Sequence, residues 1–283
     1  MEPVIADAVA ALLGSAIART EGLSGGDINE AHAATLADGR QVFVKTNARA
    51  PAGMFAAEAA GLSWLASAQA VRLPRVLGAG ERFLALELLR PGRRGRSFDE
   101  ELGRALAALH RAGPGSFGLD HDNFIGRLPQ SNHAHARWSD FYRQQRLEPQ
   151  VRRASDAGLL PPSLRRDLDR LLASLDDRVG PEEPPARLHG DLWGGNLMCD
   201  DDGAPCLIDP AAYGGHREID LAMMRLFGGF GSATFAAYDE TYPLADGHED
   251  RVSLYQLYPL LVHVNLFGGS YVGAVASAIQ RVY

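Results

Sequence analysis

The residues best suited to chemistry lie between positions 188 and 210. Asp191 is followed five residues later by Asn196, and Asp209 lies a further thirteen residues along the chain. A turn at Asp202-Gly203 predicts a hairpin that places Asn196 and Asp209 side by side. Their oxygen atoms suit Mg²⁺, while Asp191 would be free to accept a proton from an attacking hydroxyl group. Each residue alone is typical of a turn, but the three at this spacing favour phosphoryl transfer.

A lone lysine is the candidate cation for such a reaction. The 28 basic residues include a single lysine, Lys45, which ends an apolar, strand-like run. Glu58 follows thirteen residues later on the apolar stripe of a predicted helix, where an unpaired carboxylate is costly. We therefore expect a Lys45–Glu58 ion pair that directs the ammonium group at nucleotide phosphates.

Two further segments are candidates for nucleotide contact. The loop Ser24-Gly25-Gly26 is expected to cover the phosphates with its backbone N–H groups. The strand-like run 83–88 leads into a linker, so the backbone of Leu86, Glu87 and Leu88 is expected at a hinge beside adenine. An ordinary sheet strand would show the same pattern.

The order of elements predicts how these residues are positioned. Apolar periodicity predicts helices over residues 3–18, 54–68, 98–112, 138–154 and 161–179, and from 217 onward. Strand-like runs flank an Asp38-Gly39 turn and recur at 75–78, at 83–88 and within 187–210. The polar stretch 90–96 separates a β-rich N-terminal lobe, residues 1–89, from a mainly helical C-terminal lobe, residues 90–283. We predict a two-lobed α+β fold with a nucleotide cleft between the lobes.

The composition argues against several classes of protein. The 283 residues carry a net charge of −7, whereas nucleic-acid and anionic-membrane binders usually present a basic face. No uninterrupted apolar run is long enough to span a membrane, and the N-terminus lacks the basic region of a signal peptide. Cys199 and Cys206 are too few for a disulfide framework, although they flank a turn where they could face each other. We expect a cytoplasmic monomer or homodimer without nucleic-acid or membrane partners.

Motifs along most of the chain resemble the fructosamine kinase, or ketosamine-3-kinase, family, a branch of the aminoglycoside-phosphotransferase-like kinases with a protein-kinase-like fold. They lie at residues 23–30, 42–45, 128–130, 141–146, 189–196, 213–218, 227–230 and 254–258. Trp193-Gly194-Gly195 is more specific to this family than the general kinase spacing. The resemblance implies ATP-dependent phosphorylation of the sugar 3-hydroxyl of a ketosamine, free or on a glycated protein, which leads to deglycation.

The resemblance also implies a role for each matched residue. Asp191 would accept the proton, Asn196 and Asp209 would hold Mg²⁺, and Lys45 would bind phosphates with Glu58 behind it. His189 and Asp220 would support the catalytic loop rather than take part in the chemistry.

Three residues are candidates for substrate contact. Trp193 is placed to stack on a sugar face, although packing of the catalytic loop is an equal alternative. His216 and Asn123 are polar residues of loops in the C-terminal lobe. For His216 a satisfied turn histidine is the stronger interpretation.

Three other functions remain as alternatives to a ketosamine kinase. An aminoglycoside or other small-molecule phosphotransferase would share the fold, because a fold does not fix a substrate. An inactive nucleotide-binding regulatory module would be expected to lack Lys45, Asp191, Asn196 or Asp209, and all four are present. A metal-dependent phosphoesterase would leave Lys45 and the hinge strand unexplained.

Overall fold

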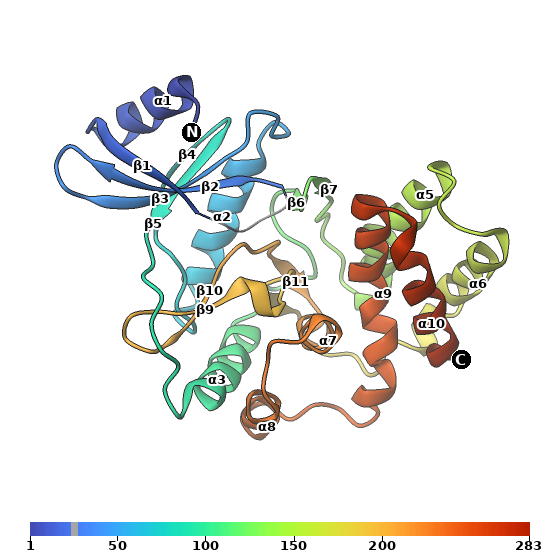
Figure 1. Ribbon diagram of the computed structural model, residues 1–283. Helices are drawn as coiled ribbons and strands as arrows, with labels where there is room; N and C mark the ends of the chain where they lie inside the picture. Colours follow the sequence, from blue (N-terminus) through green and yellow to red (C-terminus); the bar gives the residue numbers. More distant parts are fainter. Residues whose placement is uncertain (24–27) are drawn as a thin grey trace.

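The structure, a computed structural model, describes residues 1–23 and 28–283 (Figure 1). Its N-terminal part is an antiparallel sheet with the strand order β1-β2-β3-β5-β4. The strands are β1 (Ile17–Leu23), β2 (Glu30–Leu36), β3 (Gln41–Thr46), β4 (Val76–Gly80) and β5 (Phe83–Glu87). Helices α1 (Pro3–Leu13) and α2 (Met54–Ala66) bury apolar residues against opposite faces of this sheet, because alternate residues of a strand point to opposite sides.

Helices dominate the rest of the chain (Figure 1). They are α3 (Phe98–Arg111), α4 (Trp138–Phe141), α5 (Glu148–Asp156), α6 (Pro162–Ala173), α7 (Glu218–Phe227), α8 (Ser232–Thr241), α9 (His248–Phe267) and α10 (Val272–Val282). Short strands pair between them: β6 (Asn123–Ile125) with β7 (Leu128–Gln130), β8 (Ala186–Leu188) with β11 (Tyr213–Gly215), and β9 (Leu197–Cys199) with β10 (Pro205–Leu207). The predicted two-lobed α+β fold is confirmed.

An apolar cluster links the two parts of the molecule at the site. It joins Leu62 of α2 and Leu84 of β5 to Leu106 of α3, and also includes Leu192, which precedes β9, and Leu207, which ends β10. These five side chains are almost fully buried. The segment that carries the catalytic candidates is therefore held against both α2 and α3 by the hydrophobic effect.

Several elements differ from the sequence-based prediction. The first helix ends at Leu13 because Gly14 adopts the left-handed conformation that caps helices, with φ of 70°. Ile17 then begins β1, which the prediction missed because its mostly exposed residues show no apolar alternation. The predicted helix over 138–154 contains a π-helical segment, Tyr142–Leu147, which turns Arg146 into the interior.

The segment 88–97 joins β5 to α3, and the predicted lobe boundary between residues 89 and 90 falls within it. Across the described residues, we find no helix with both the length and the apolar character needed to cross a membrane.

Candidate functional site

Lys45 lies at the centre of an ionic cluster in which Lys45 and Glu58 are largely buried and Asp209 is partly exposed. Its Nζ atom, near the end of β3, is 2.6 Å from Oε1 of Glu58 on α2 and 2.8 Å from Oδ1 of Asp209. The expected Lys45–Glu58 pair is thus present, and the direct contact with Asp209 was not foreseen. Burial acts to lower the pKa of Lys45, but the charges of Glu58 and Asp209 outweigh it and raise the pKa, so the ammonium group stays charged.

Asp191 and Asn196 share the loop between β8 and β9. The Nδ2 group of Asn196 donates to the carbonyl oxygen of Asp191 at 2.8 Å and to its Oδ2 atom at 3.2 Å. Burial raises the pKa of Asp191 to about 7, while the hydrogen bond from Asn196 opposes this rise and the charge of Asp209 adds to it. A carboxylate with a pKa near neutrality is suited to accept a proton from a hydroxyl group.

The β9–β10 hairpin brings Asn196 next to Asp209, as the turn signal predicted. The N–H of Ile208 donates to the carbonyl oxygen of Asn196 at 3.0 Å. Asn196 directs its Nδ2 group at Asp191, and Asp209 directs Oδ1 at Lys45. Among the described residues, no hydrogen bond occupies Oδ1 of Asn196 or Oδ2 of Asp209, so these two oxygens are available to a cation.

These two oxygens alone do not complete a metal cage. In the described part of the chain, no three His, Cys, Asp or Glu side chains gather in a cluster that could hold a metal ion. A pair of oxygen ligands fits Mg²⁺ that is held jointly by protein and nucleotide phosphates, which is the usual arrangement for this ion.

Asp220 on α7 anchors the backbone that precedes Asp191. Its carboxylate accepts the N–H groups of His189 at 2.8 Å and Gly190 at 2.9 Å. Behind it, Nε2 of His110 lies 3.3 Å from Asp220, and Nδ1 of His110 lies 2.7 Å from the hydroxyl group of Tyr238. His110 on α3 and Tyr238 on α8 cannot be found from the sequence, because no pattern in either helix signals that these polar groups are buried against Asp220.

The side chain of His189 is buried within the loop between β8 and β9. Nε2 lies 2.9 Å from the carbonyl oxygen of Ile208, and Nδ1 accepts the N–H of Asp191 at 3.3 Å. These partners require the proton on Nε2. Burial lowers the pKa of His189, which keeps the ring neutral. The ring therefore links the catalytic loop to the end of the β9–β10 hairpin.

The nucleotide-contact candidates are only partly described. Leu86 is buried in β5, Glu87 ends this strand, and Leu88 follows it. The Glu87 carboxylate binds Arg72 at 2.6 Å and the N–H of Arg75 at 3.1 Å, so it is occupied by protein partners. The loop Ser24-Gly25-Gly26 lies outside the described residues.

The two cysteines do not face each other. In the β9–β10 register, Cys199 is opposite Pro205 and Cys206 is opposite Met198. Both are free thiols, and burial raises the pKa of Cys206 to about 12, so this thiol is an inert packing group.

Trp193 is the one substrate candidate that lies at the surface. Its exposed fraction is 42%. The following residue, Gly194, touches the turn after α7: a Cβ atom on Gly194 would lie 2.9 Å from the carbonyl oxygen of Gly228, and one on Gly229 would lie 2.6 Å from the Gly194 Cα atom. This backbone contact fixes the loop beneath Trp193.

The other two substrate candidates are buried. Asn123 begins β6 rather than lying in a loop, and for His216 burial favours the stronger interpretation, a turn histidine, over substrate contact. His216 stacks on Tyr255 at 5.3 Å between ring centroids and is 2% exposed. Asn123 is 5% exposed and donates to the carbonyl oxygen of Ala212 at 2.8 Å. Neither side chain is available to a sugar, because its polar atoms lie within the protein interior.

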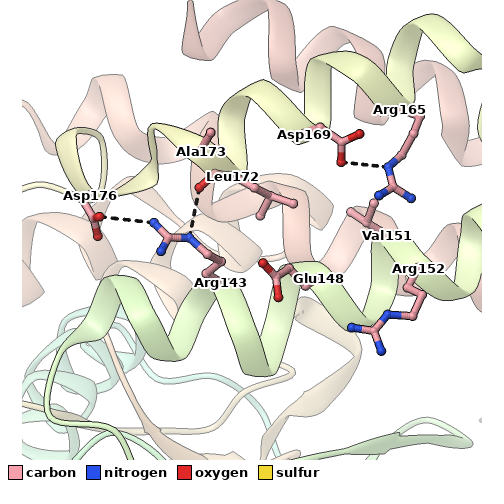
Figure 2. Close-up of a pocket in the computed structure, with 9 residues that line it drawn as sticks. All are labelled: Arg143, Glu148, Val151, Arg152, Arg165, Asp169, Leu172, Ala173 and Asp176. Carbon is pink, nitrogen blue, oxygen red and sulfur yellow. Dashed lines mark hydrogen bonds and ion pairs between the residues drawn. The ribbon is translucent and has the colours of Figure 1, made fainter.

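A polar groove between α5 and α6 lies apart from these residues (Figure 2). Arg143 at one end contacts Asp176 and the carbonyl oxygen of Leu172, and Arg165 at the other end contacts Asp169. Its charged groups largely pair with each other, and none of the site residues predicted from the sequence lines it.

Comparison with known proteins gives consistent matches over the whole chain. The family model described as fructosamine kinase matches residues 1–283. A relative named as a ketoamine kinase, from Lactiplantibacillus plantarum, is 40% identical over 270 residues, which is 94% of each chain. The chloroplastic protein-ribulosamine 3-kinase of Arabidopsis thaliana is 37% identical over 276 residues, covering 93% of this chain and 82% of the relative.

Solved structures agree with these matches. A crystal structure from Thermobifida fusca described as a fructosamine-3-kinase has a TM-score of 0.91 at 41% identity and covers 98% of both chains. The gentamicin complex of APH(2")-IIa has a TM-score of 0.67 at 12% identity, covering 100% of this chain and 96% of the other, and therefore shares the fold alone. With a family model matched from residue 1 to residue 283, this chain belongs to the fructosamine kinase family.

Proposed function

We propose that this protein transfers the γ-phosphoryl group of ATP to the sugar 3-hydroxyl of ketosamines, which leads to deglycation. The observation that supports this most directly is the position of Lys45 between Glu58 and Asp209, with Asn196 linking Asp209 to Asp191. The arrangement combines a phosphate-binding cation, two oxygen ligands for a metal ion and a proton acceptor, as phosphoryl transfer requires.

Each residue has one part in the proposed reaction. Asp191 accepts the proton of the sugar hydroxyl while the oxygen of that hydroxyl forms a bond to the γ-phosphorus atom. The bond from the γ-phosphorus atom to the oxygen that bridges it to the β-phosphate breaks, and ADP is released. Lys45 binds the donor phosphates. Oδ1 of Asn196 and Oδ2 of Asp209 would hold Mg²⁺, which when bound neutralises phosphate charge. Trp193 offers an exposed ring for the sugar.

An ADP-release assay with Mg-ATP tests the proposal against ribulose-lysine, fructose-lysine and kanamycin. We expect release with the ketosamines, and a decrease of about 10²–10⁴-fold in Asp191→Asn, since this variant lacks the proton acceptor. ATP binding should stay near that of wild type, because Asp191 makes no proposed phosphate contact. The matched control is Asp167→Asn on α6, outside the site, which should retain full turnover.

Other outcomes have clear meanings. Release with kanamycin alone would keep the fold and the residue roles but assign an aminoglycoside substrate. An Asp191→Asn protein as active as wild type would refute the assigned proton acceptor. A cytoplasmic location and a monomeric or homodimeric state stay predictions from the sequence.

A further inference from the structure

A network of buried amides lies beneath the segment that follows Asp209. Nδ2 of Asn123 donates to the carbonyl oxygen of Ala212 at 2.8 Å, and Nε2 of Gln130 lies 3.2 Å from that of Ala211. The two side chains also bind each other, with Gln130 Nε2 at 2.8 Å from Asn123 Oδ1. We propose that Asn123 and Gln130 are positioning residues that hold Asp209 in the orientation required for Mg-nucleotide binding, an inference that rests on the proposed function.

The backbone of Asp209 needs such support. Its φ of 55° is unfavourable for a residue with a side chain, and such conformations persist when the surrounding structure determines them. On one side, the N–H of Ala211 donates to the carbonyl oxygen of His189 at 2.9 Å. Asn123 and Gln130 bind the carbonyl groups of the same segment. Ala211 is therefore held at both its N–H and its carbonyl group, and Ala212 at its carbonyl group.

The same segment contacts the helix that carries Glu58. A Cβ atom on Gly61 of α2 would lie 3.5 Å from the Cβ atom of Ala212, so α2 packs directly against this residue. Asp209 and Glu58 in turn share Lys45. A displacement of Ala212 would therefore disturb both carboxylates that orient the ammonium group.

Outer partners determine which way the two amides point. Arg146, from the π-helical segment, donates to Oδ1 of Asn132 at 2.6 Å, and Nδ2 of Asn132 donates to Oδ1 of Asn123 at 2.9 Å. The hydroxyl group of Tyr258 on α9 donates to Oε1 of Gln130. With both oxygens occupied as acceptors, each NH₂ group must face the Ala211–Ala212 backbone.

Gln130→Met tests the proposal, because it keeps the length of the side chain and removes both donated hydrogen bonds. The matched control is Gln150→Met. Gln150 is also buried, and its amide oxygen accepts a hydrogen bond from Asn265 at 2.8 Å, apart from the Asp209 segment. If the role of Gln130 were purely structural, Gln130→Met and Gln150→Met would change ADP affinity in the same way. A positioning role predicts that only Gln130→Met reduces the gain in ADP affinity that Mg²⁺ provides.

The readout is the affinity for ADP, measured by calorimetry with Mg²⁺ and again with EDTA, at a temperature where circular dichroism shows each variant folded. We expect Gln130→Met to reduce the gain in affinity from Mg²⁺ on the order of tenfold, the usual effect of removing a partner of a metal ligand. The turnover number with ribulose-lysine should fall by a similar factor. Gln150→Met should retain the wild-type gain.

Tyr258→Phe provides a milder second variant should Gln130→Met not fold, since it removes only the hydroxyl group that orients Gln130. An unchanged Mg²⁺-dependent gain in the folded variant, or an equal loss in Gln150→Met, would overturn the proposal. The nucleotide measurements need no sugar acceptor. A wild-type protein inactive on ketosamines would therefore refute the proposed substrate and still leave the positioning role open to this test.

Discussion

The two carboxylates assigned to the proposed site, Asp191 and Asp209, are held by neighbours of different kinds. The backbone around Asp191 is anchored by a buried charge, because Asp220 accepts the N–H groups of His189 and Gly190. The backbone after Asp209 is anchored by the neutral amides of Asn123 and Gln130. We call these the carboxylate anchor and the amide anchor.

This difference has energetic consequences. Hydrogen bonds to a charged group are stronger than those between neutral groups, but removing the charge leaves several buried donors unsatisfied at once. In the amide anchor, the backbone is held instead by several weaker, directional hydrogen bonds between neutral groups. Loss of the carboxylate anchor should therefore mainly unfold the protein, whereas loss of one amide-anchor contact should mainly misplace Asp209.

The largest expected effect is that of Asp220→Ala. It removes the acceptor for two buried N–H groups and the partner of His110, so the free energy of unfolding should fall by about 3–5 kcal/mol. Urea denaturation measures this loss. Asp169→Ala, at a half-exposed ion pair on α6, is the control and should change stability by less than about 0.5 kcal/mol. A smaller loss in Asp220→Ala than in Gln130→Met would reverse the comparison.

Arg146→Met should have the next largest effect, on the amide anchor. It removes donors to Asn132 Oδ1 and to the carbonyl oxygen of Ser131, and we expect a loss of about 2–3 kcal/mol in urea denaturation. The exposed Arg153 on the neighbouring helix α5 supplies the control Arg153→Met. Equal stabilities for the two variants would mean that the guanidinium group does not support the amide anchor.

One tyrosine hydroxyl group supports each anchor, and removing each hydroxyl group in turn compares the two anchors directly. Tyr238→Phe removes the partner of His110, and Tyr258→Phe removes that of Gln130; each should cost about 1 kcal/mol in thermal or urea unfolding. Only Tyr258→Phe should also reduce the Mg²⁺-dependent gain in ADP affinity. A reduced gain in Tyr238→Phe as well would show that the two anchors act as one unit.

The acid sensitivity of wild type and Asp220→Asn should differ only within a narrow pH range. This difference is the smallest of the expected effects. Burial acts to raise the pKa of Asp220, but the hydrogen bond and charge of His110 outweigh it and leave this pKa below its usual 3.8. The stabilisation is therefore complete above this value and is lost as the pH falls through the lower folded pKa. Urea midpoints between pH 3 and 7 should decline at the acid end more steeply in wild type than in Asp220→Asn. Parallel curves would contradict a lowered pKa.

Sequence alone predicts two of the pairings seen at the candidate site, Lys45 with Glu58 and Asn196 beside Asp209. Lys45 was conspicuous as a lone lysine at a strand end, and Glu58 as a carboxylate on an apolar stripe. Asn196 and Asp209 were joined by a recognisable turn, because hairpins form locally. These predictions needed only local structure, and the long-range contact between Lys45 and Asp209 was not among them.

The amide anchor could not be predicted in the same way. Asn123 and Gln130 lie in two three-residue strands, and their amides read as ordinary polar loop residues until burial is known. For that reason the sequence makes Asn123 a candidate for substrate contact. Arg146 and Tyr258 reach the network through a π-helical segment and a distant helix, and no local sequence pattern records such tertiary contacts.

The contact between Gly194 and the Gly228-Gly229 turn limits how this enzyme can be re-engineered. Because any side chain at Gly194 or Gly229 would collide with the opposing main chain, selectivity cannot be altered by introducing new groups at these two positions. Trp193, directly beside them, is partly exposed, and its ring lies over Gly195. A library that tests the proposed contact of Trp193 with the sugar should therefore randomise Trp193 and leave both glycines untouched.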